Sequence, residues 1–471
     1  MRLARILAVL RREVNSIDSS RVCPSSQRVS IIRAHVAGKD RRAPDSRVIT
    51  AGRWLLVAGL MFMVTGDGPS STVRISKWPT PVPFLAWQWL YLVLLVLGIA
   101  CFVAGGGVKS WKPPHLRVMV APLGALLAAF LLSAITSQVH VLSATALLTV
   151  MAIALAGWML ALAFEDERLS RAVWPTIAVA VLLLAVRVII WRRDEGFNIV
   201  AFQVPNNFWL GKLQLAWVFN LMAPLLLARS MGEPRRYLAA LYWLTWAAAG
   251  VATYLLFSRM GSIVFAVATL GVWIMNPGQW RKVLLVLIVG LGIGAALVAR
   301  SDRTSRFVIT TILSPDRDPG VEQRFGIWRD ALRLFRSRPI TGTGLGTYDE
   351  VTYRLDGTTA EPFFRQQGWH AHNVYLHLLA ETGIVGLFAW CYFWYAIIAR
   401  FLGAWKRADT QYRLYAAGAL WAVVAFLVLS ISEVLIGARV HASFRMNLTI
   451  ALVVVLGLHI AAEIDRRRSL H

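Results

Sequence analysis

Residues 141–164 read VLSATALLTVMAIALAGWMLALAF, a stretch without a charged side chain. An α-helix rises about 1.5 Å per residue, so a run of this length crosses the roughly 30 Å hydrocarbon layer of a bilayer. Similar runs recur along most of the 471 residues, of which 57% are hydrophobic and 16% are charged. A soluble protein carries roughly 25% charged residues. The composition therefore excludes a soluble fold and predicts an all-α polytopic membrane protein.

Twelve apolar segments reach or approach the length of a membrane span. They cover residues 48–65, 83–104, 118–137, 141–164, 172–191, 208–228, 237–257, 260–275, 283–299, 382–399, 414–435 and 446–464. Arg53 interrupts the first segment, and we expect its long side chain to reach the headgroup region. Twelve spans would place both termini on the same side of the membrane.

Basic residues give the orientation of these spans. The net charge is +24, and lysine and arginine gather in the tail 1–47, in alternate short connections and in the tail 465–471. This bias places both tails in the cytoplasm and argues against a nucleic-acid partner. The tail 1–47 has no apolar core with a cleavage site, so we do not expect a signal peptide. The expected order is the tail 1–47, spans over 48–299, an extracytoplasmic loop over 300–372, spans over 373–464, and the tail 465–471.

Several motifs that would indicate soluble or metal-dependent chemistry are absent or misplaced. Cys23, Cys101 and Cys391 lie far apart, so we expect neither a disulfide framework nor a metal cluster. No Walker sequence or zinc-ligand spacing occurs. The acidic run 165–167 lies at a predicted cytoplasmic helix end, where a structural role is the better interpretation. We expect no metal and no cofactor.

The long loop contains a predicted amphipathic helix over residues 323–338. Helical spacing places four apolar residues on one face and three arginines beside them. The apolar set is Phe325, Trp328, Leu332 and Phe335, and the arginines are Arg329, Arg333 and Arg336. Two interpretations remain open. The helix packs on the bundle with solvated arginines, or its cations face the diphosphate head of a membrane lipid.

A glycine-rich stretch, GTGLG at residues 342–346, follows this helix. It resembles a dinucleotide-binding fingerprint, but that motif needs a preceding strand and a following helix in a soluble βαβ unit. Here a helix precedes it and a membrane span follows. We therefore reject nucleotide binding at this stretch.

The loop ends in His370-Ala371-His372-Asn373, where the chain returns to the bilayer. Imidazole titrates near neutral pH, so a histidine here can remove a proton from a hydroxyl group. We expect His372, and less strongly His370, to contact substrate. A structural role or an incomplete zinc site is the alternative.

Other candidate residues lie within or beside the spans. Arg187 lies deep in the span 172–191, where a charge is costly, so it is either functional or reaches toward Arg192 and the interface. Arg259 begins a span on the extracytoplasmic side and is the stronger candidate. Asn206 and Asn373 can orient a substrate or cap a helix.

These residues together resemble a known family. The matching pattern consists of Arg324 with Trp328, Pro339, Gly342, Gly344 and Gly346, then HAHN at 370–373, Gly383 and Gly386, with PNN at 205–207 and Ser258-Arg259 upstream. It resembles the superfamily of O-antigen ligases, O-antigen polymerases and O-linked oligosaccharyltransferases. The part of the pattern from Arg324 onward lies within residues 320–390, and the layout of spans extends the resemblance over most of the chain.

The resemblance implies a GT-C glycosyltransferase in the bacterial inner membrane that moves a glycan from undecaprenyl diphosphate to lipid A-core oligosaccharide. The reaction would be inverting and metal-independent, and a monomer is expected. His372 would be the base, and Arg259 would act with it in catalysis. Arg187, Arg324, Arg329 and Arg333 would bind the diphosphate, and Asn206, Asn373 and His370 would make other substrate contacts.

Three alternatives stay open. A polymerase or a protein O-oligosaccharyltransferase would use the same donor. A flippase for lipid-linked glycans would share the spans and a cationic cavity, but such carriers often have two similar halves, and we find no internal repeat here.

Overall fold

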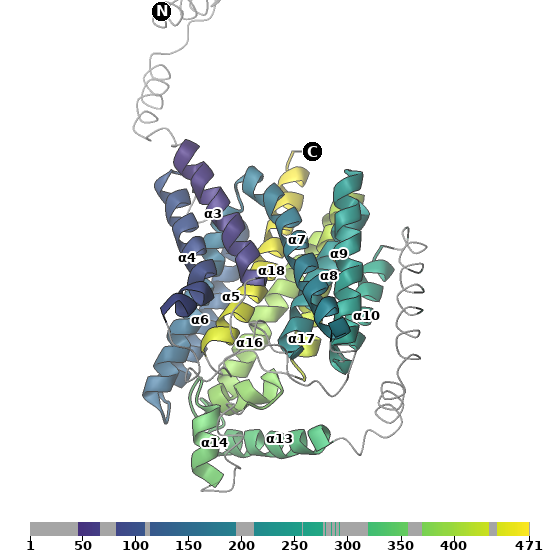
Figure 1. The fold of residues 1–471 in the computed structure, drawn as a ribbon. Helices are drawn as coiled ribbons and strands as arrows, with labels where there is room; N and C mark the ends of the chain where they lie inside the picture. Colours follow the sequence, from purple (N-terminus) through teal and green to yellow (C-terminus); the bar gives the residue numbers. More distant parts are fainter. Residues whose placement is uncertain are drawn as a thin grey trace, which may run out of the picture. The chain divides into compact units, whose positions relative to one another are not determined.

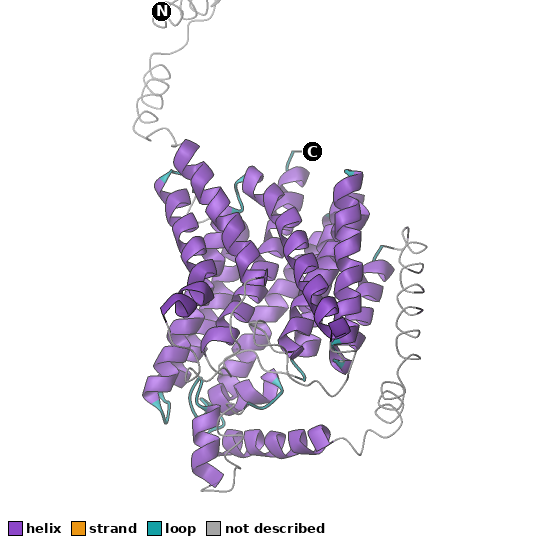
Figure 2. Cartoon of the chain, in the orientation of Figure 1, coloured by secondary structure: helices purple, strands orange, loops and turns teal. Residues whose placement is uncertain are grey.

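The computed structural model describes residues 46–65, 82–108, 114–194, 212–256, 258–276, 319–356, 370–432 and 440–470, and a few single positions between 278 and 292. The described residues form helices, turns and loops without a strand (Figure 2). The predicted tail 1–47 lies outside them for all but its last two residues. Asn206 and most of the predicted span 283–299 also lie outside.

The helices are arranged as a bundle with two further helices at one end, of which α13 (Pro319–Ser337) lies across the bundle (Figure 1). The bundle contains α3 (Ser46–Thr65), α4 (Val82–Ala104), α5 (Pro114–Ile135), α6 (His140–Ala163), α7 (Glu167–Asp194), α8 (Lys212–Gly232), α9 (Arg236–Leu255), α10 (Arg259–Ile274), α16 (Val374–Arg407), α17 (Thr410–Leu429) and α18 (Val440–Arg468). The other helix at that end is α14 (Tyr348–Asp356).

Within the described residues, nine helices are long and apolar enough to cross a membrane. Two shorter apolar helices, Leu90–Ala104 and Arg259–Ile274, correspond to two further predicted spans. The expected class, an all-α polytopic membrane protein, is therefore confirmed. The predicted span 283–299 lies mostly outside the described residues, so the predicted number of twelve stays a prediction.

The two ends of the bundle can be told apart by contacts between helix ends. Arg400 near the end of α16 contacts Asp465 near the end of α18, with 2.6 Å between Nη2 and Oδ2. The starts of both helices therefore lie together at the other end. We call the end where α16 begins, directly after the histidines, the histidine end, and we call the other end the opposite end.

The longest difference from the predicted spans is in α16. The apolar pattern predicts a span over 382–399, and α16 runs from Val374 to Arg407 with non-helical φ and ψ at Gly383, so two helices meet at a kink beside the predicted start. The part before the kink contains His377 and Glu381, which lower the local hydropathy, yet both side chains are almost fully buried in protein. The apolar pattern therefore located the part after the kink and missed the part before it.

Arg53 has a partner from a distant turn of the chain. Its Nε and Nη2 atoms donate to both carboxylate oxygens of Asp166, at 2.9 and 2.6 Å. Asp166 also accepts from the Leu169 amide at 2.9 Å, which caps the start of α7. The expectation that Arg53 reaches the headgroups stays a prediction, and the structural interpretation of the acidic run 165–167 is supported.

The predicted amphipathic helix is present as α13. Ile327, Ala331 and Leu334 are buried and form a small core with Tyr348 and Ala371. Phe325 and Leu332 of the predicted apolar face are 55% and 37% exposed. The helix therefore packs on the protein mainly through its smaller apolar side chains and leaves two of the larger ones outside.

Candidate functional site

The glycine turn 342–346 is fastened to a break in α16. Gly383 has φ 63° and ψ −164°, which interrupts the helix there. The amide of Thr343 donates to the Ala380 carbonyl at 3.0 Å, and the amide of Ile384 donates to the Pro339 carbonyl at 2.9 Å. The carbonyl and amide groups that the break releases are thus paired with the turn. This contact positions the chain between α13 and α14.

Two glycines allow this close approach. A methyl group at Gly383 would overlap the Ile340 carbonyl oxygen, and one at Gly342 would overlap the Glu381 carbonyl carbon. Both glycines also have positive φ, which side chains disfavour. The turn therefore has a structural task, in agreement with the rejection of nucleotide binding.

Glu381 is the central polar residue of this contact. Its carboxylate accepts the Gly346 amide at 2.8 Å and the Tyr348 amide at 2.9 Å. Its carbonyl accepts the Ser133 hydroxyl at 2.8 Å and the Gly344 amide at 2.9 Å. An acidic side chain at the first amides of a helix also interacts well with the helix dipole. Glu381 therefore joins α5, the glycine turn, α14 and α16.

The segment His370-Ala371-His372-Asn373 is held on both sides. The indole Nε1 of Trp328 donates to the Ala371 carbonyl at 2.9 Å. The Asn373 side chain accepts the Leu376 amide at 3.1 Å and caps α16. The rings of His370 and His372 lie 4.1 Å apart between centroids. The two imidazoles are thus neighbours at the histidine end of the bundle, and both side chains are partly exposed.

His372 has an unusual backbone. Its φ is 45°, and within the described part of the chain it is the one residue other than glycine with positive φ. Residues in this region cost of order 1–3 kcal/mol and tend to gather at functional sites. The neighbouring hydrogen bonds at Ala371 and Asn373 keep the backbone in this conformation.

His377 lies one helical turn below the histidine segment and is 2% exposed. Its Nε2 lies 3.4 Å from Oε1 of Glu381, and its ring centroid lies 5.0 Å from that of Tyr348. Both residues were absent from the predicted site. A carboxylate inside a span is a functional candidate by default, but Glu381 lies one residue before the predicted span 382–399, so this rule did not select it.

Arg259 begins α10, as predicted from its position. Ser258 caps the helix by accepting the Gly261 amide at 3.2 Å. A methyl group at Gly261 would lie 3.1 Å from the Cβ of Ala216, so the start of α10 lies against the first turns of α8.

The start of α8 in turn lies near the end of α17. The rings of Trp217 and Phe426 are 5.7 Å apart, and the Val374 amide donates to the carbonyl of Ser430, directly after α17, at 2.8 Å. The starts of α8, α10 and α16 therefore share one end of the bundle. Arg259 and the histidine segment lie at this same end.

The other predicted cations and amides have different surroundings. Arg187 is half-buried, and its Nη1 donates to the carbonyl of Thr65, the last residue of α3, at 3.2 Å. On α13, Arg324 is half-buried, and Arg329 and Arg333 are exposed. Arg333 also lies 3.6 Å from Asp330. Asn373 serves as a helix cap, the simpler of its two predicted roles.

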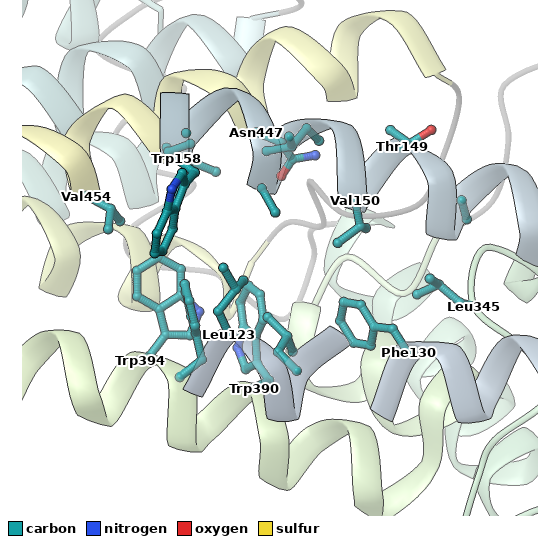
Figure 3. Close-up of a pocket in the computed structure, with 18 of the residues that line it drawn as sticks. Leu123, Phe130, Thr149, Val150, Trp158, Leu345, Trp390, Trp394, Asn447 and Val454 are labelled. Atoms are coloured by element: carbon teal, nitrogen blue, oxygen red, sulfur yellow. The ribbon is translucent and has the colours of Figure 1, made fainter. Parts of the chain in front are cut away.

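A cavity of about 450 Å³ lies between α5, α6, α16 and α18 and continues to the start of α14. Its walls are mainly hydrocarbon and aromatic, including Leu123, Trp158, Trp390 and Trp394 (Figure 3). Gly346, whose amide is bound by Glu381, lines the cavity as well. The Glu381 contact therefore helps to shape the cavity wall. We call this cavity the groove.

Among the described residues, no group of three histidine, cysteine or acidic side chains lies close enough to hold a metal ion. Cys101 and Cys391 are free thiols.

The described helices and the site define a polytopic helical membrane protein with polar residues gathered at one end. Residues 244–391 match a family model described as O-antigen ligase. The matched region contains α10, α13, the glycine turn, the histidine segment and the break in α16. The match supports placing the chain in the O-antigen ligase/polymerase superfamily and implies a glycosyltransferase-type enzyme. A comparison with curated proteins found no match.

Proposed function

We propose that this protein transfers a glycan from undecaprenyl diphosphate to lipid A-core oligosaccharide at the periplasmic face of the bacterial inner membrane. The match over 244–391 supports the family activity. The shared placement of Arg259 and the histidine segment at one end of the bundle supports a single reaction site there. Membrane-embedded substrates agree with the many candidate spans.

The observation that carries the proposal is the strained backbone of His372, with φ 45°. A fold keeps such strain where the position of a side chain matters more than its stability. The Trp328 and Asn373 hydrogen bonds hold the chain immediately before and after this imidazole. We assign His372 the role of base.

The chemistry needs little more than a base and stabilising cations. His372 accepts the proton of an acceptor sugar hydroxyl, whose oxygen forms a bond to the anomeric carbon of the donor glycan. The bond from that carbon to the phosphate oxygen breaks, and its electron pair leaves with undecaprenyl diphosphate. Displacement in line inverts the anomeric centre. No metal or cofactor takes part.

Arginine is suited to stabilise the leaving diphosphate, because its guanidinium stays charged and forms paired hydrogen bonds to phosphate. We assign this role first to Arg259 and Arg324. Arg187, Arg329 and Arg333 are further candidates, while Asn206, Asn373 and His370 are candidates for sugar contacts. Removing one preorganised donor of this kind costs on the order of 10² to 10³ in rate.

The experiment supplies purified full-length protein with lipid-linked glycan and three acceptors in parallel. These are lipid A-core, a second lipid-linked glycan and a pilin-like protein. We expect product with lipid A-core in the presence of EDTA. Product with one of the other two acceptors would instead identify a polymerase or a protein O-oligosaccharyltransferase. Loss of transfer in EDTA would contradict the metal-independent mechanism, and no transfer to any acceptor would favour a flippase.

A further inference from the structure

A second, smaller hydrophobic core lies at the histidine end, separate from the main core of the bundle. Its buried members come from α13, α14, the histidine segment and α16, and they are Ile327, Ala331, Leu334, Tyr348, Val351, Ala371 and Ala380. Tyr348 is 1% exposed, and it is the member of this core that has a polar group on its side chain. A buried tyrosine hydroxyl usually needs a hydrogen-bond partner. The small core therefore brings three helices together around Tyr348.

Tyr348 is bound through both its backbone and its side chain. Its amide donates to Oε1 of Glu381 on α16 at 2.9 Å. Its hydroxyl donates to the carbonyl of Ile327 on α13 at 3.0 Å, and this hydrogen bond is buried. Because the phenol ring is rigid, the two bonds hold α13 at a fixed separation from α16. Loss of the hydroxyl would remove this connection and leave the aromatic ring in the core.

The next residue of α13 contacts the segment that contains His372. The indole Nε1 of Trp328 donates to the Ala371 carbonyl at 2.9 Å, and Ala371 is fully buried. Hydrogen bonds and backbone thus form a closed path, which we call the circuit. The circuit passes through Glu381, Tyr348, Ile327, Trp328 and Ala371 and returns along the chain to α16. It connects the start of α14 to the residue before the proposed base.

The circuit acts on the strained backbone torsion of His372. The Ala371 carbonyl and the His372 amide belong to one planar peptide group. The φ of His372 is the rotation between that group and the rest of the residue, and its value is 45°. The Trp328 bond fixes the peptide group before His372, while the Asn373 side chain caps α16 after it. Movement of α13 would release the first of these and let φ return to the negative values that side chains prefer.

We propose that Tyr348 and Trp328 are positioning residues, which keep the His372 imidazole in place by fixing α13 against α16. This inference rests on the proposed function, in which His372 is the base. Neither positioning residue is assigned a contact with substrate. A shift of about 1 Å in a catalytic group can cost on the order of 10² in rate, so loss of the circuit would slow the chemical step. Substrate binding would change little.

Two tyrosines provide matched variants. Tyr348→Phe removes the hydroxyl that binds the Ile327 carbonyl. Tyr375→Phe removes a hydroxyl that donates to the Leu427 carbonyl, also at 3.0 Å. Tyr375 is closer to His372 in the sequence, but its hydroxyl connects α16 to α17 and lies outside the circuit. The pair therefore separates loss of the circuit from loss of a similar hydrogen bond near the base.

Steady-state kinetics of the full-length protein in detergent give the first test, with lipid-linked glycan and lipid A-core as substrates. Tyr348→Phe should lower kcat on the order of tenfold and change KM for the acceptor by less than about twofold. Tyr375→Phe should leave both values within about twofold of those of the unmodified protein. An unchanged kcat in Tyr348→Phe, an effect confined to KM, or equal losses in the two variants would overturn the inference.

A double-mutant cycle tests whether the two positioning residues act along one path. Trp328→Phe removes the indole donor and keeps an aromatic side chain. Since loss of either bond opens the same circuit, adding Tyr348→Phe should deepen the kcat loss of Trp328→Phe by less than about twofold. Losses that multiply would show that the two residues act independently and would contradict the circuit.

Hydrogen exchange tests the circuit without relying on transfer. The amides of Val374 and Leu376 are both hydrogen-bonded just after His372, so they report on the backbone there. Peptides that cover residues 370–376 should exchange on the order of threefold faster in Tyr348→Phe, while peptides from α9 should not change. Unchanged exchange over 370–376, or an equal increase in α9, would overturn the inference.

The outcomes separate this inference from the proposed function. Transfer to lipid A-core that Tyr348→Phe leaves unaffected would overturn the inference and keep the proposed function. Faster exchange over 370–376 in a protein that transfers no glycan would reject the proposed function and keep the circuit as the element that positions His372. Should thermal unfolding show that Tyr348→Phe does not fold, Trp328→Phe opens the circuit at its other bond, and the same changes in kcat and exchange are expected.

Discussion

The two ends of the helix bundle hold their polar side chains in different ways. At the opposite end, charged side chains pair with each other. Arg53 contacts Asp166, Arg400 and Arg407 contact Asp465, and Arg466 and Arg467 contact Glu463. At the histidine end, polar side chains bind the backbone. Glu381 accepts two amides, Trp328 binds the Ala371 carbonyl, and Arg338 donates to the Thr136 carbonyl at 2.7 Å.

This difference has a physical consequence. The ion pairs at the opposite end join side chains to each other, and that of Arg53 and Asp166 is partly buried, with the two side chains 20% and 18% exposed. Hydrogen bonds from side chains to buried backbone groups fix the path of the chain, and breaking them leaves a buried group unpaired. The opposite end is therefore held through contacts between side chains, whereas at the histidine end the path of the backbone is fixed. The following variants test whether the two ends differ in this way.

Substitution of His372 should have the largest effect. Loss of a general base costs typically 10² to 10⁴ in rate, so both His372→Ala and His372→Gly should lose transfer by about that factor. Glycine adopts positive φ without strain, so His372→Gly should unfold at a temperature equal to or above that of His372→Ala. Transfer assays and thermal unfolding in detergent measure the two effects. Near-normal transfer by either variant would remove His372 from the chemistry.

Gly383→Ala should destabilise the protein by about 3 kcal/mol or more, because the new methyl group meets the Ile340 carbonyl at positive φ. Gly124→Ala in α5 is the matched control, since nothing lies within 4 Å of its new methyl group. The control should be neutral or stabilising by up to about 1 kcal/mol. Denaturant or thermal unfolding compares the two variants. Equal stabilities would show that the turn is not fastened to α16 as described.

Arg229 tests a buried stacking contact near the opposite end. Its guanidinium lies 4.0 Å from the Trp174 ring centroid and 3.9 Å from that of Tyr415. Arg229→Lys should cost about 1–2 kcal/mol, because an ammonium cannot stack on two rings. Arg171→Lys, at an exposed pair with Glu167, should change stability by less than about 0.5 kcal/mol. Similar unfolding temperatures for both variants would contradict a stabilising role of the stacking.

The smallest effect is expected for the pH dependence of the stability that Asp166 contributes. Burial alone would raise its pKa, but the hydrogen bonds from Arg53 and Leu169 outweigh burial and hold the pKa below 3.8. A lowered pKa in the folded state gives stability that is complete above the unfolded value and is lost as the pH falls through the folded value. Asp166→Asn should lower the unfolding temperature slightly at neutral pH, and the difference should vanish in acid. A difference that persists at the lowest pH would contradict this pairing.

Much of the fold follows from hydropathy alone. Apolar runs predicted the spans to within a few residues at most ends, because a lipid-facing helix must be apolar whatever its neighbours are. Hydropathy did not predict the helical residues of α16 before the kink at Gly383, which are surrounded by protein rather than lipid. The first turns of α16 contain His377 and Glu381, whose burial depends on α14 and the glycine turn, and neither contact is visible in a local window.

The sequence indicated candidate residues for the site, but it indicated little of their geometry. The position of Arg259 at the start of a span indicated which end it occupies. No local pattern indicates the positive φ of His372, because the Trp328 and Asn373 hydrogen bonds that hold it come from tertiary packing. Arg53 pairs with Asp166, which lies far away in the sequence. The sequence of the span 48–65 therefore could not reveal the partner of its interrupting arginine.

The break at Gly383 also bears on how the protein is made. The glycine turn is synthesised before its partners Ala380 and Glu381. The turn and the first amides of α14 must therefore wait, unpaired, until the beginning of α16 has been inserted. Completion of the loop between α13 and α16 is thus coupled to membrane integration of α16, so a stalled or misinserted α16 would leave an unfinished loop open to proteases and quality control.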